Sequence, residues 1–168
     1  MLRVGVLTIS DTGARGERDD TSGQEIVDAL SLVEGYVVKK ELVPDERDEI
    51  AGKLSSWADG GEVDVVLTTG GTGLSQRDVT PEATTMVLDR IAPGFAEAMR
   101  ARTFNLTPTA ILSRGVAGVR GTCLIINLPG SPQAVRECLR VVLPVVPHAV
   151  AIIKGEVTEH PAPDNGRG

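Results

Sequence analysis

The expected fold is decided by the stretch Val65-Val66-Leu67-Thr68-Thr69-Gly70-Gly71-Thr72-Gly73. Its apolar, β-branched beginning predicts a buried strand, and the glycines that follow let the main chain turn tightly without side chains in the way. Such a concave turn presents several main-chain N–H groups to one point, so it can bind an anion such as phosphate. The turn can also be a plain connection, but Arg77, Asp78 and Glu82 follow with more charge than a connection needs.

Two common nucleotide-binding motifs do not fit this turn. A Walker phosphate loop has a lysine after its last glycine, whereas Gly73 is followed by Leu74 and Ser75. The dinucleotide fingerprint needs a further glycine where Gln76 stands. The turn therefore argues against a common NTPase or dehydrogenase.

Length and composition predict one domain. The chain has 168 residues, 41% of them hydrophobic, which suffices for one proper core but not comfortably for two. We expect this domain to span residues 1–154, and residues 155–168 to form a flexible tail. The net charge of −6, the pI near 4.9 and the aromatic content of 2% argue against a nucleic-acid partner, because phosphate backbones are held by clustered Lys and Arg.

The sequence predicts a cytoplasmic protein without a membrane partner. Its first apolar run ends at Asp11, too soon for a signal peptide, and its longest apolar region, 141–153, is broken by prolines. Cys123 and Cys138 lie in apolar segments and are expected to be reduced core residues. The histidines at 148 and 160 form no zinc-ligand pattern.

Apolar periodicity divides the chain into alternating strands and helices. Strands are expected over 3–9, 36–43, 63–68 and 122–128, the second of them near an edge of the sheet because charged residues interrupt it. Helices are expected after Ser22, after Asp45, from Pro81 to about Arg90, around 95–102, and as a packed pair within 132–153. Residues 109–121 show no clear pattern.

Four helix starts carry local capping signals. Ser22 begins a capping box, Asp45 is the favoured N-cap of the second helix, and Thr80 precedes an N1 proline and the acid Glu82. Ser131 is expected to cap the helix that follows the last strand. On these signals alone, Asp45 and Glu82 need no role beyond stabilising helix starts.

The alternation predicts a three-layer α/β/α fold with a mostly parallel sheet, and ligands bind such sheets beyond the carboxyl ends of their strands. Four loops are expected to meet there: Ser10-Asp11, Pro44-Asp45, the turn from Gly70 to Asp78, and Leu128 to Pro132. Aspartates in three of these loops, beside turns suited to phosphate, indicate magnesium-dependent phosphoryl or nucleotidyl transfer. The alternative is that these acids only cap helices and solvate loops.

An ordered set of motifs resembles the molybdopterin adenylyltransferase family, whose bacterial members are called MogA and MoaB. The resemblance runs from Arg3 to about Ile153. Its motifs are Leu67 to Gly73, Arg77-Asp78-Val79-Thr80-Pro81-Glu82-Ala83-Thr84, Pro93-Gly94-Phe95, Leu112-Ser113-Arg114 and Asn127-Leu128-Pro129-Gly130-Ser131-Pro132. The resemblance implies a molybdopterin-binding fold and an enzyme that adenylylates molybdopterin with Mg-ATP and releases pyrophosphate.

The resemblance also implies site residues. Asp45 and Asp78 match the family's essential aspartates, which we expect to be catalytic and to hold Mg²⁺. The residues expected to bind substrate are Thr69, Gly70, Gly71, Thr72 and Gly73 in one loop, Pro129, Gly130 and Ser131 in another, and, with a less defined role, Ser10 and Asp11.

The chemistry favours a particular division of labour among these groups. The nucleophile would be the terminal phosphate of the pterin, whose second pKa of about 6 leaves it ionised at neutral pH, so no strong general base is needed. The main obstacle is repulsion between two polyanions. We therefore expect Asp45 and Asp78 to position Mg²⁺, while main-chain N–H groups and Thr72 hold a phosphate.

Other interpretations stay open at this point. Residues 77–81 and 93–97 look closer to MogA, whereas the short chain and residues 116–119 also resemble MoaB, some members of which have uncertain activity. A non-catalytic pterin-binding or carrier protein is the main alternative, and a scaffold is a weaker one. The resemblance further implies a homotrimer, or a hexamer as in MoaB, and a possible handover to a molybdate-insertion protein.

Overall fold

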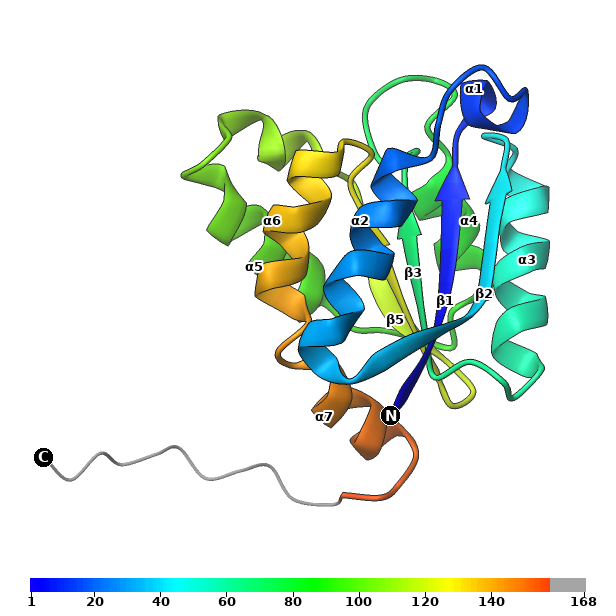
Figure 1. Cartoon of the computed structure of the whole chain (residues 1–168), viewed down its shortest axis with the longest axis vertical. Helices are drawn as coiled ribbons and strands as arrows, with labels where there is room; N and C mark the ends of the chain where they lie inside the picture. The colour runs from blue at the N-terminus through cyan, green and yellow to red at the C-terminus, as the bar shows by residue number, and fades with distance from the viewer. Residues whose placement is uncertain (158–168) are drawn as a thin grey trace, which may run out of the picture.

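In the computed structural model, which describes residues 1–157, the strands form one six-stranded sheet with helices on both faces (Figure 1). The strands are β1 (Leu2–Ile9), β2 (Gly35–Val43), β3 (Val65–Thr69), β4 (Arg90–Ile91), β5 (Ala117–Arg120) and β6 (Cys123–Leu128). Their order is β2-β1-β3-β6-β5-β4. The first four in this order are parallel, whereas β5 is antiparallel to β6 and β4 to β5, so the predicted mostly parallel α/β fold is confirmed.

The helices separate into two layers. They are α1 (Asp11–Ala14), α2 (Thr21–Ala29), α3 (Arg47–Asp59), α4 (Thr80–Val87), α5 (Pro93–Phe104), α6 (Pro132–Val142) and α7 (Val146–Ile153), with 3₁₀ turns η1 (Leu30–Val33) and η2 (Pro108–Leu112). Helices α2, α5, α6 and α7 pack on one face, and α3 and α4 on the other. Among the described residues no helix is both long and apolar enough to cross a membrane.

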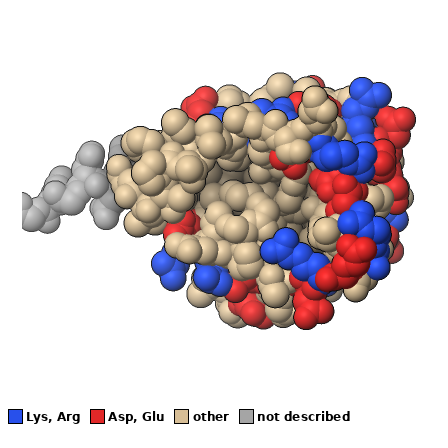
Figure 2. All heavy atoms as spheres, turned by 90° about the horizontal axis from the view of Figure 1, so that it is seen from above, with Lys and Arg blue, Asp and Glu red and all other residues tan. Residues whose placement is uncertain are grey.

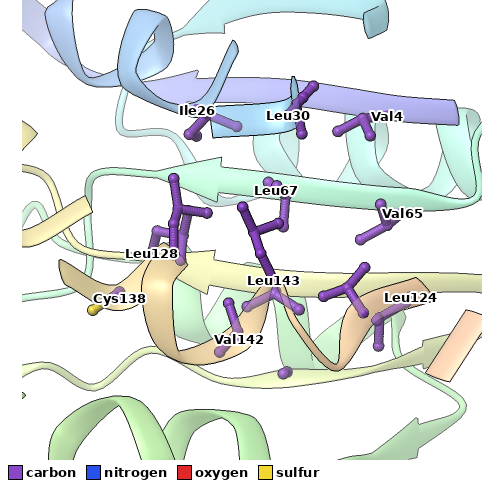
Figure 3. Packing of buried hydrophobic residues seen from close by; sticks show 14 of the residues in the cluster. Val4, Ile26, Leu30, Val65, Leu67, Leu124, Leu128, Cys138, Val142 and Leu143 are labelled. Atoms are coloured by element: carbon purple, nitrogen blue, oxygen red, sulfur yellow. The ribbon is translucent and has the colours of Figure 1, made fainter. Parts of the chain in front are cut away.

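The period of two along the strands builds both cores. On β3, Val65 and Leu67 face the α2–α6 layer, while Val66 between them faces α3 and α4. The same alternation on β6 places Leu124 and Leu128 in the cluster on the α6 side of the sheet, together with Cys138 and Leu143 (Figure 3). Because both faces of these strands are covered, they read as continuous apolar runs, which is the pattern that predicted them.

The antiparallel edge of the sheet was not predicted. Strand β5 lies within the unassigned residues 109–121, and β4 has only two residues, both exposed. Gly118 permits this edge, because a Cβ there would overlap the carbonyl oxygen of Arg90 on β4. Such a close approach depends on a partner strand distant in sequence, so periodicity cannot reveal it.

Three of the four predicted caps are wrong, and one is confirmed. Helix α2 is capped by Asp20, whose carboxylate accepts from Gly23 N at 2.8 Å, and the position before α3 is Glu46 rather than Asp45. Thr80 lies inside α4, which ends at Val87 and not near Arg90. Ser131 caps α6 as expected, accepting from Ala134 N at 3.2 Å. The side chains of Ser22 and Asp45 instead bond to loops distant in sequence, and that of Thr80 bonds to Gly70 in the glycine turn before α4.

Both cysteines are buried free thiols, as predicted. Burial raises the pKa of Cys123 to about 12 and that of Cys138 to about 11, so both are inert at neutral pH. His148 lies in α7, whereas His160 and most of the predicted tail, residues 158–168, fall outside the described residues.

A buried ion cluster fastens α7 to the end of the sheet opposite the site loops. The Asp64 carboxylate, only 4% exposed, pairs with Arg3 Nη2 at 2.8 Å and Lys154 Nζ at 2.6 Å, and accepts from Arg3 N at 2.9 Å. Burial by itself would raise the pKa of Asp64, but the hydrogen bonds from Arg3 and Lys154 lower it to about 2.

Replacing this carboxylate should lower stability in a pH-dependent manner. Because the folded-state pKa lies below the unfolded value of about 3.9, the stabilisation is present above pH 4 and is lost as the pH falls toward 2. Asp64→Asn should therefore cost about 2 kcal/mol of unfolding free energy at pH 7 and much less near pH 2, measured by urea unfolding.

Asp59→Asn is the control, since it removes the Arg120–Asp59 pair, whose carboxylate is exposed, and should cost at most about 1 kcal/mol. An Asp64→Asn deficit that is equal at both pH values would show that packing, not charge, is responsible.

Candidate active site

The candidate site lies beyond the carboxyl ends of β1, β2, β3 and β6, where the predicted loops meet. Two cavities of about 400 and 380 Å³ adjoin there. They share the lining residues Gly71, Asp78, Gly130 and Ser131. Figure 2 views the molecule from this side: charged side chains crowd the side that carries α1 and α3, and the hollow beside them is mostly uncharged.

The glycine turn requires its glycines for two reasons. Gly70 and Gly71 have φ of +100° and +66°, a region that L side chains rarely adopt. In addition, a Cβ on Gly70 would overlap the carbonyl oxygen of Ile9, and one on Gly71 would overlap Thr80 Oγ1. The main chain after β3 therefore touches both the end of β1 and the start of α4.

Threonine hydroxyls hold this turn by its carbonyl groups. Thr80 Oγ1 donates to Gly70 O at 3.0 Å and Thr80 N to Gly71 O at 3.1 Å. Thr69 Oγ1 donates to Pro129 O at 2.6 Å, which ties the turn to the loop after β6. Within residues 1–157 the N–H groups of the turn take no part in this anchoring. They therefore stay available to bind an anion.

Arg114 binds both ends of the loop from Gly73 to Asp78. Its Nε donates to Gly73 O and its Nη2 to Asp78 O, each at 2.8 Å, while Arg114 N donates to Thr72 O at 2.8 Å. Its Nη1 pairs with Glu82, which lowers the pKa of that carboxyl. Glu82 thus does more than compensate the dipole of α4: it orients the arginine that holds Asp78.

Asp45 and Asp11 bind each other reciprocally. Asp45 Oδ2 accepts from Asp11 N at 2.9 Å, and Asp11 Oδ1 accepts from Asp45 N at 3.0 Å. Arg77 then clamps the Asp11 carboxylate with two hydrogen bonds, of 3.0 and 2.9 Å, and reaches Glu46 at 3.0 Å. The loops after β1, β2 and β3 are joined by these contacts.

The two carboxyls of this pair have opposite pKa shifts. The hydrogen bonds from Arg77, and then that from Asp45 N, lower the pKa of Asp11. Burial raises the pKa of Asp45, and the negative charges of Asp11 and Asp78 raise it further. A cation placed beside Asp45 would relieve this repulsion.

The Asp45 and Asp78 carboxylates both face the glycine turn. Asp45 Oδ1 lies 3.1 Å from the position of a Cβ on Gly71, and Asp78 Oδ2 lies 2.8 Å from that of a Cβ on Gly73. Asp78 Oδ2 also accepts from Ser75 N at 3.2 Å.

The Asp45 and Asp78 carboxylates fit a Mg²⁺ ion that is shared with a bound substrate better than a metal ion held by protein side chains alone. Within residues 1–157 no group of three or more His, Cys, Asp or Glu side chains is arranged to hold a metal ion. Mg²⁺ commonly takes one or two carboxylates and completes its shell with phosphate oxygens and water. Two acids beside a turn suited to phosphate match that requirement, so this chain would hold the ion together with its substrate.

The structure brings the predicted site residues together. Gly71, Thr72, Gly73, Asp78, Pro129, Gly130 and Ser131 line the larger cavity, and Ser10, Asp45, Thr69, Gly70, Gly71, Asp78, Gly130 and Ser131 line the smaller. Asp11 lines neither cavity but is hydrogen-bonded to Asp45, which lines the smaller one.

Sequence reasoning assigned no role to Arg77, Thr80 or Arg114 in this site. Arg77 and Thr80 are close to Asp78 in the sequence, and Arg114 belongs to the motif Leu112-Ser113-Arg114. Their partners, however, are main-chain groups or distant acids, which no local signal identifies.

Comparisons with known proteins agree with this geometry. The family described as "Probable molybdopterin binding domain" matches residues 5–148. The molybdopterin adenylyltransferase of Helicobacter pylori (strain J99 / ATCC 700824) is 46% identical over 156 residues, which is 92% of this chain and 89% of that protein. The molybdopterin adenylyltransferase of Escherichia coli (strain K12) is 42% identical over 140 residues, which is 82% of this chain and 72% of that protein.

A solved structure shares the fold closely. The molybdopterin biosynthesis enzyme MoaB of Thermus thermophilus superposes with a TM-score of 0.87 at 55% identity, over 92% of this chain and 98% of that one. This chain belongs to the molybdopterin-binding domain family, and the resemblance noted in the sequence is confirmed.

The glycine turn yields a stability prediction. Gly71→Ala should lower the unfolding free energy by about 2 kcal/mol or more, because positive φ and overlap with Thr80 act together. Gly16→Ala is the matched control, since Gly16 has φ of +72° but no atom within 4 Å of a Cβ, and should cost about 1 kcal/mol. Equal losses in urea unfolding would show that the close approach to Thr80 contributes nothing.

Proposed function

We propose that this chain is a molybdopterin adenylyltransferase, which uses Mg-ATP to adenylylate molybdopterin in molybdenum cofactor biosynthesis. One observation carries the proposal: two carboxylates face a single glycine turn at the junction of two cavities. Cavities of about 400 and 380 Å³ are in the range of small-molecule sites, so two substrates can meet at that junction. The relatives named as this enzyme, at 42–46% identity, support it.

The proposed reaction is a phosphate-to-phosphate transfer. An oxygen of the pterin's terminal phosphate forms a bond to the α-phosphorus of ATP, and the bond from that phosphorus to the bridging α–β oxygen breaks. That oxygen's electron pair leaves with pyrophosphate. The attacking phosphate is already ionised near neutral pH, so the chain needs no strong general base.

The residues of the chain then have to align and neutralise two polyanions. Main-chain N–H groups of the glycine turn and Thr72 would hold one phosphate, and Asp45 and Asp78 would hold Mg²⁺. When bound, the ion supplies positive charge to the phosphate oxygens. Asp11 and Arg77 hold Asp45, and Arg114 holds the main chain at Asp78, so neither acid has to be ordered at the moment of reaction.

The wider setting is part of the same proposal. We infer a cytoplasmic homotrimer, with a hexamer as the alternative, that passes its product to a molybdate-insertion protein. Sedimentation of the purified protein separates trimer from hexamer.

The decisive test is product analysis of the wild type, Asp45→Ala and Asp78→Asn with molybdopterin and Mg-ATP. The wild type should form adenylylated pterin and pyrophosphate. Asp78→Asn should keep pterin binding but lose product formation by about 100-fold or more, because the amide cannot neutralise the metal's charge.

Asp48→Asn, in the exposed first turn of α3, is the control and should turn over normally. Unchanged turnover in Asp78→Asn would refute the metal-holding role, and tight pterin binding without any wild-type product would favour a carrier protein.

A further inference from the structure

Arg100, on α5, is an exception among the half-buried arginines. The described part of the chain has four of them, and Arg3, Arg114 and Arg120 each pair with a carboxylate. Arg100 pairs with no carboxylate anywhere in residues 1–157. A guanidinium stays charged at all relevant pH values, so a half-buried one without a counter-ion is costly unless a ligand supplies the negative charge.

The guanidinium of Arg100 is oriented but not saturated. Its Nη1 donates to Ser113 O at 3.3 Å and to Gly115 O at 3.2 Å. These long bonds use one of its three nitrogens, and in residues 1–157 neither Nε nor Nη2 donates a hydrogen bond. The planar fork suits two-point binding of a phosphate, which the free donors can provide.

The surroundings of Arg100 favour an anion with an apolar body. Arg100 lines the larger cavity, and no other Lys or Arg of the described residues does so. Met99, Ala96 and Leu112 provide apolar lining, and Ser113 and Thr109 are neighbouring polar residues. Asp78 and Glu137 are the acids that line this cavity, and neither of them pairs with Arg100.

We propose that Arg100 is an anion-binding residue of the larger cavity and takes a phosphate group of the substrate that occupies it. The phosphate belongs either to the pterin or to ATP; both offer the same oxyanion chemistry. Naming these substrates rests on the proposed function, whereas the unpaired charge and the cavity do not.

The test compares Arg100→Gln and Arg100→Lys with Arg102→Gln. Arg102 lies two residues away on α5, is exposed, makes no ion pair in the described chain and lines neither cavity. Molybdopterin and Mg-ATP are titrated separately by calorimetry. Arg100→Gln should weaken one of the two ligands by at least about tenfold and the other by less than about twofold, because one charged hydrogen-bonded contact is lost. Arg100→Lys should recover part of the affinity, and Arg102→Gln should bind both as the wild type does.

Two outcomes overturn the proposal. Affinity for both ligands unchanged in Arg100→Gln would show that no phosphate binds there, and equal loss for both would show that Arg100 only holds the segment Ser113–Gly115. If Arg100→Gln does not fold, judged by thermal unfolding, Arg100→Lys decides: weaker binding of one ligand alone supports the proposal, and any other pattern refutes it. The variant Arg100→Gln could lose affinity for one ligand alone while the wild type forms no adenylylated pterin. That result would support this anion site and refute the proposed function.

Discussion

The architecture of the site depends on the lack of side chains at Gly70 and Gly71. There the main chain leaving β3 passes against the carbonyl of Ile9, and the Thr80 hydroxyl occupies the space that a Cβ would fill. This contact lets the loops after the parallel strands converge closely enough to share cavity walls. Gly130, in the loop after β6, packs beside this turn, and a Cβ there would be in ordinary contact with Gly70 Cα at 3.5 Å.

Concentrating acids at this junction is unfavourable in a protein of net charge −6, and the fold offsets the cost with arginines. Arg77 neutralises Asp11 and Glu46, while Arg114 takes Glu82 and the main chain at Asp78. Neither arginine bonds to the carboxylates of Asp45 and Asp78. Neither arginine therefore occupies the oxygens of those two carboxylates, and Asp45 in particular is half-buried without forming an ion pair within residues 1–157.

The two ends of the sheet treat buried charge differently. At the amino end, Asp64 has two cations and a main-chain donor, so its charge is fully compensated and contributes stability. At the carboxyl end, Asp45 lacks a cation and Arg100 lacks an anion within the described chain. Incomplete pairing costs folding free energy, and binding of an oppositely charged ligand would recover it.

The sequence by itself determined the alternation of elements, the buried parallel strands, the glycine turn and the Ser131 cap, because each depends on residues a few positions apart. The same motifs indicated which loops meet. Only the tertiary structure decided which hydrogen bonds Ser22, Asp45 and Thr80 make. Local signals predicted each of them as a cap, but Ser22 and Asp45 bond to loops distant in sequence, and Thr80 bonds to Gly70 in the preceding glycine turn. The tertiary structure likewise decided the β4–β5 edge and the hydrogen-bond partners of Arg77, Arg100 and Arg114. A side chain with both a local and a distant hydrogen-bond partner takes the one that folding brings into better geometry, and that choice has no local sequence signal.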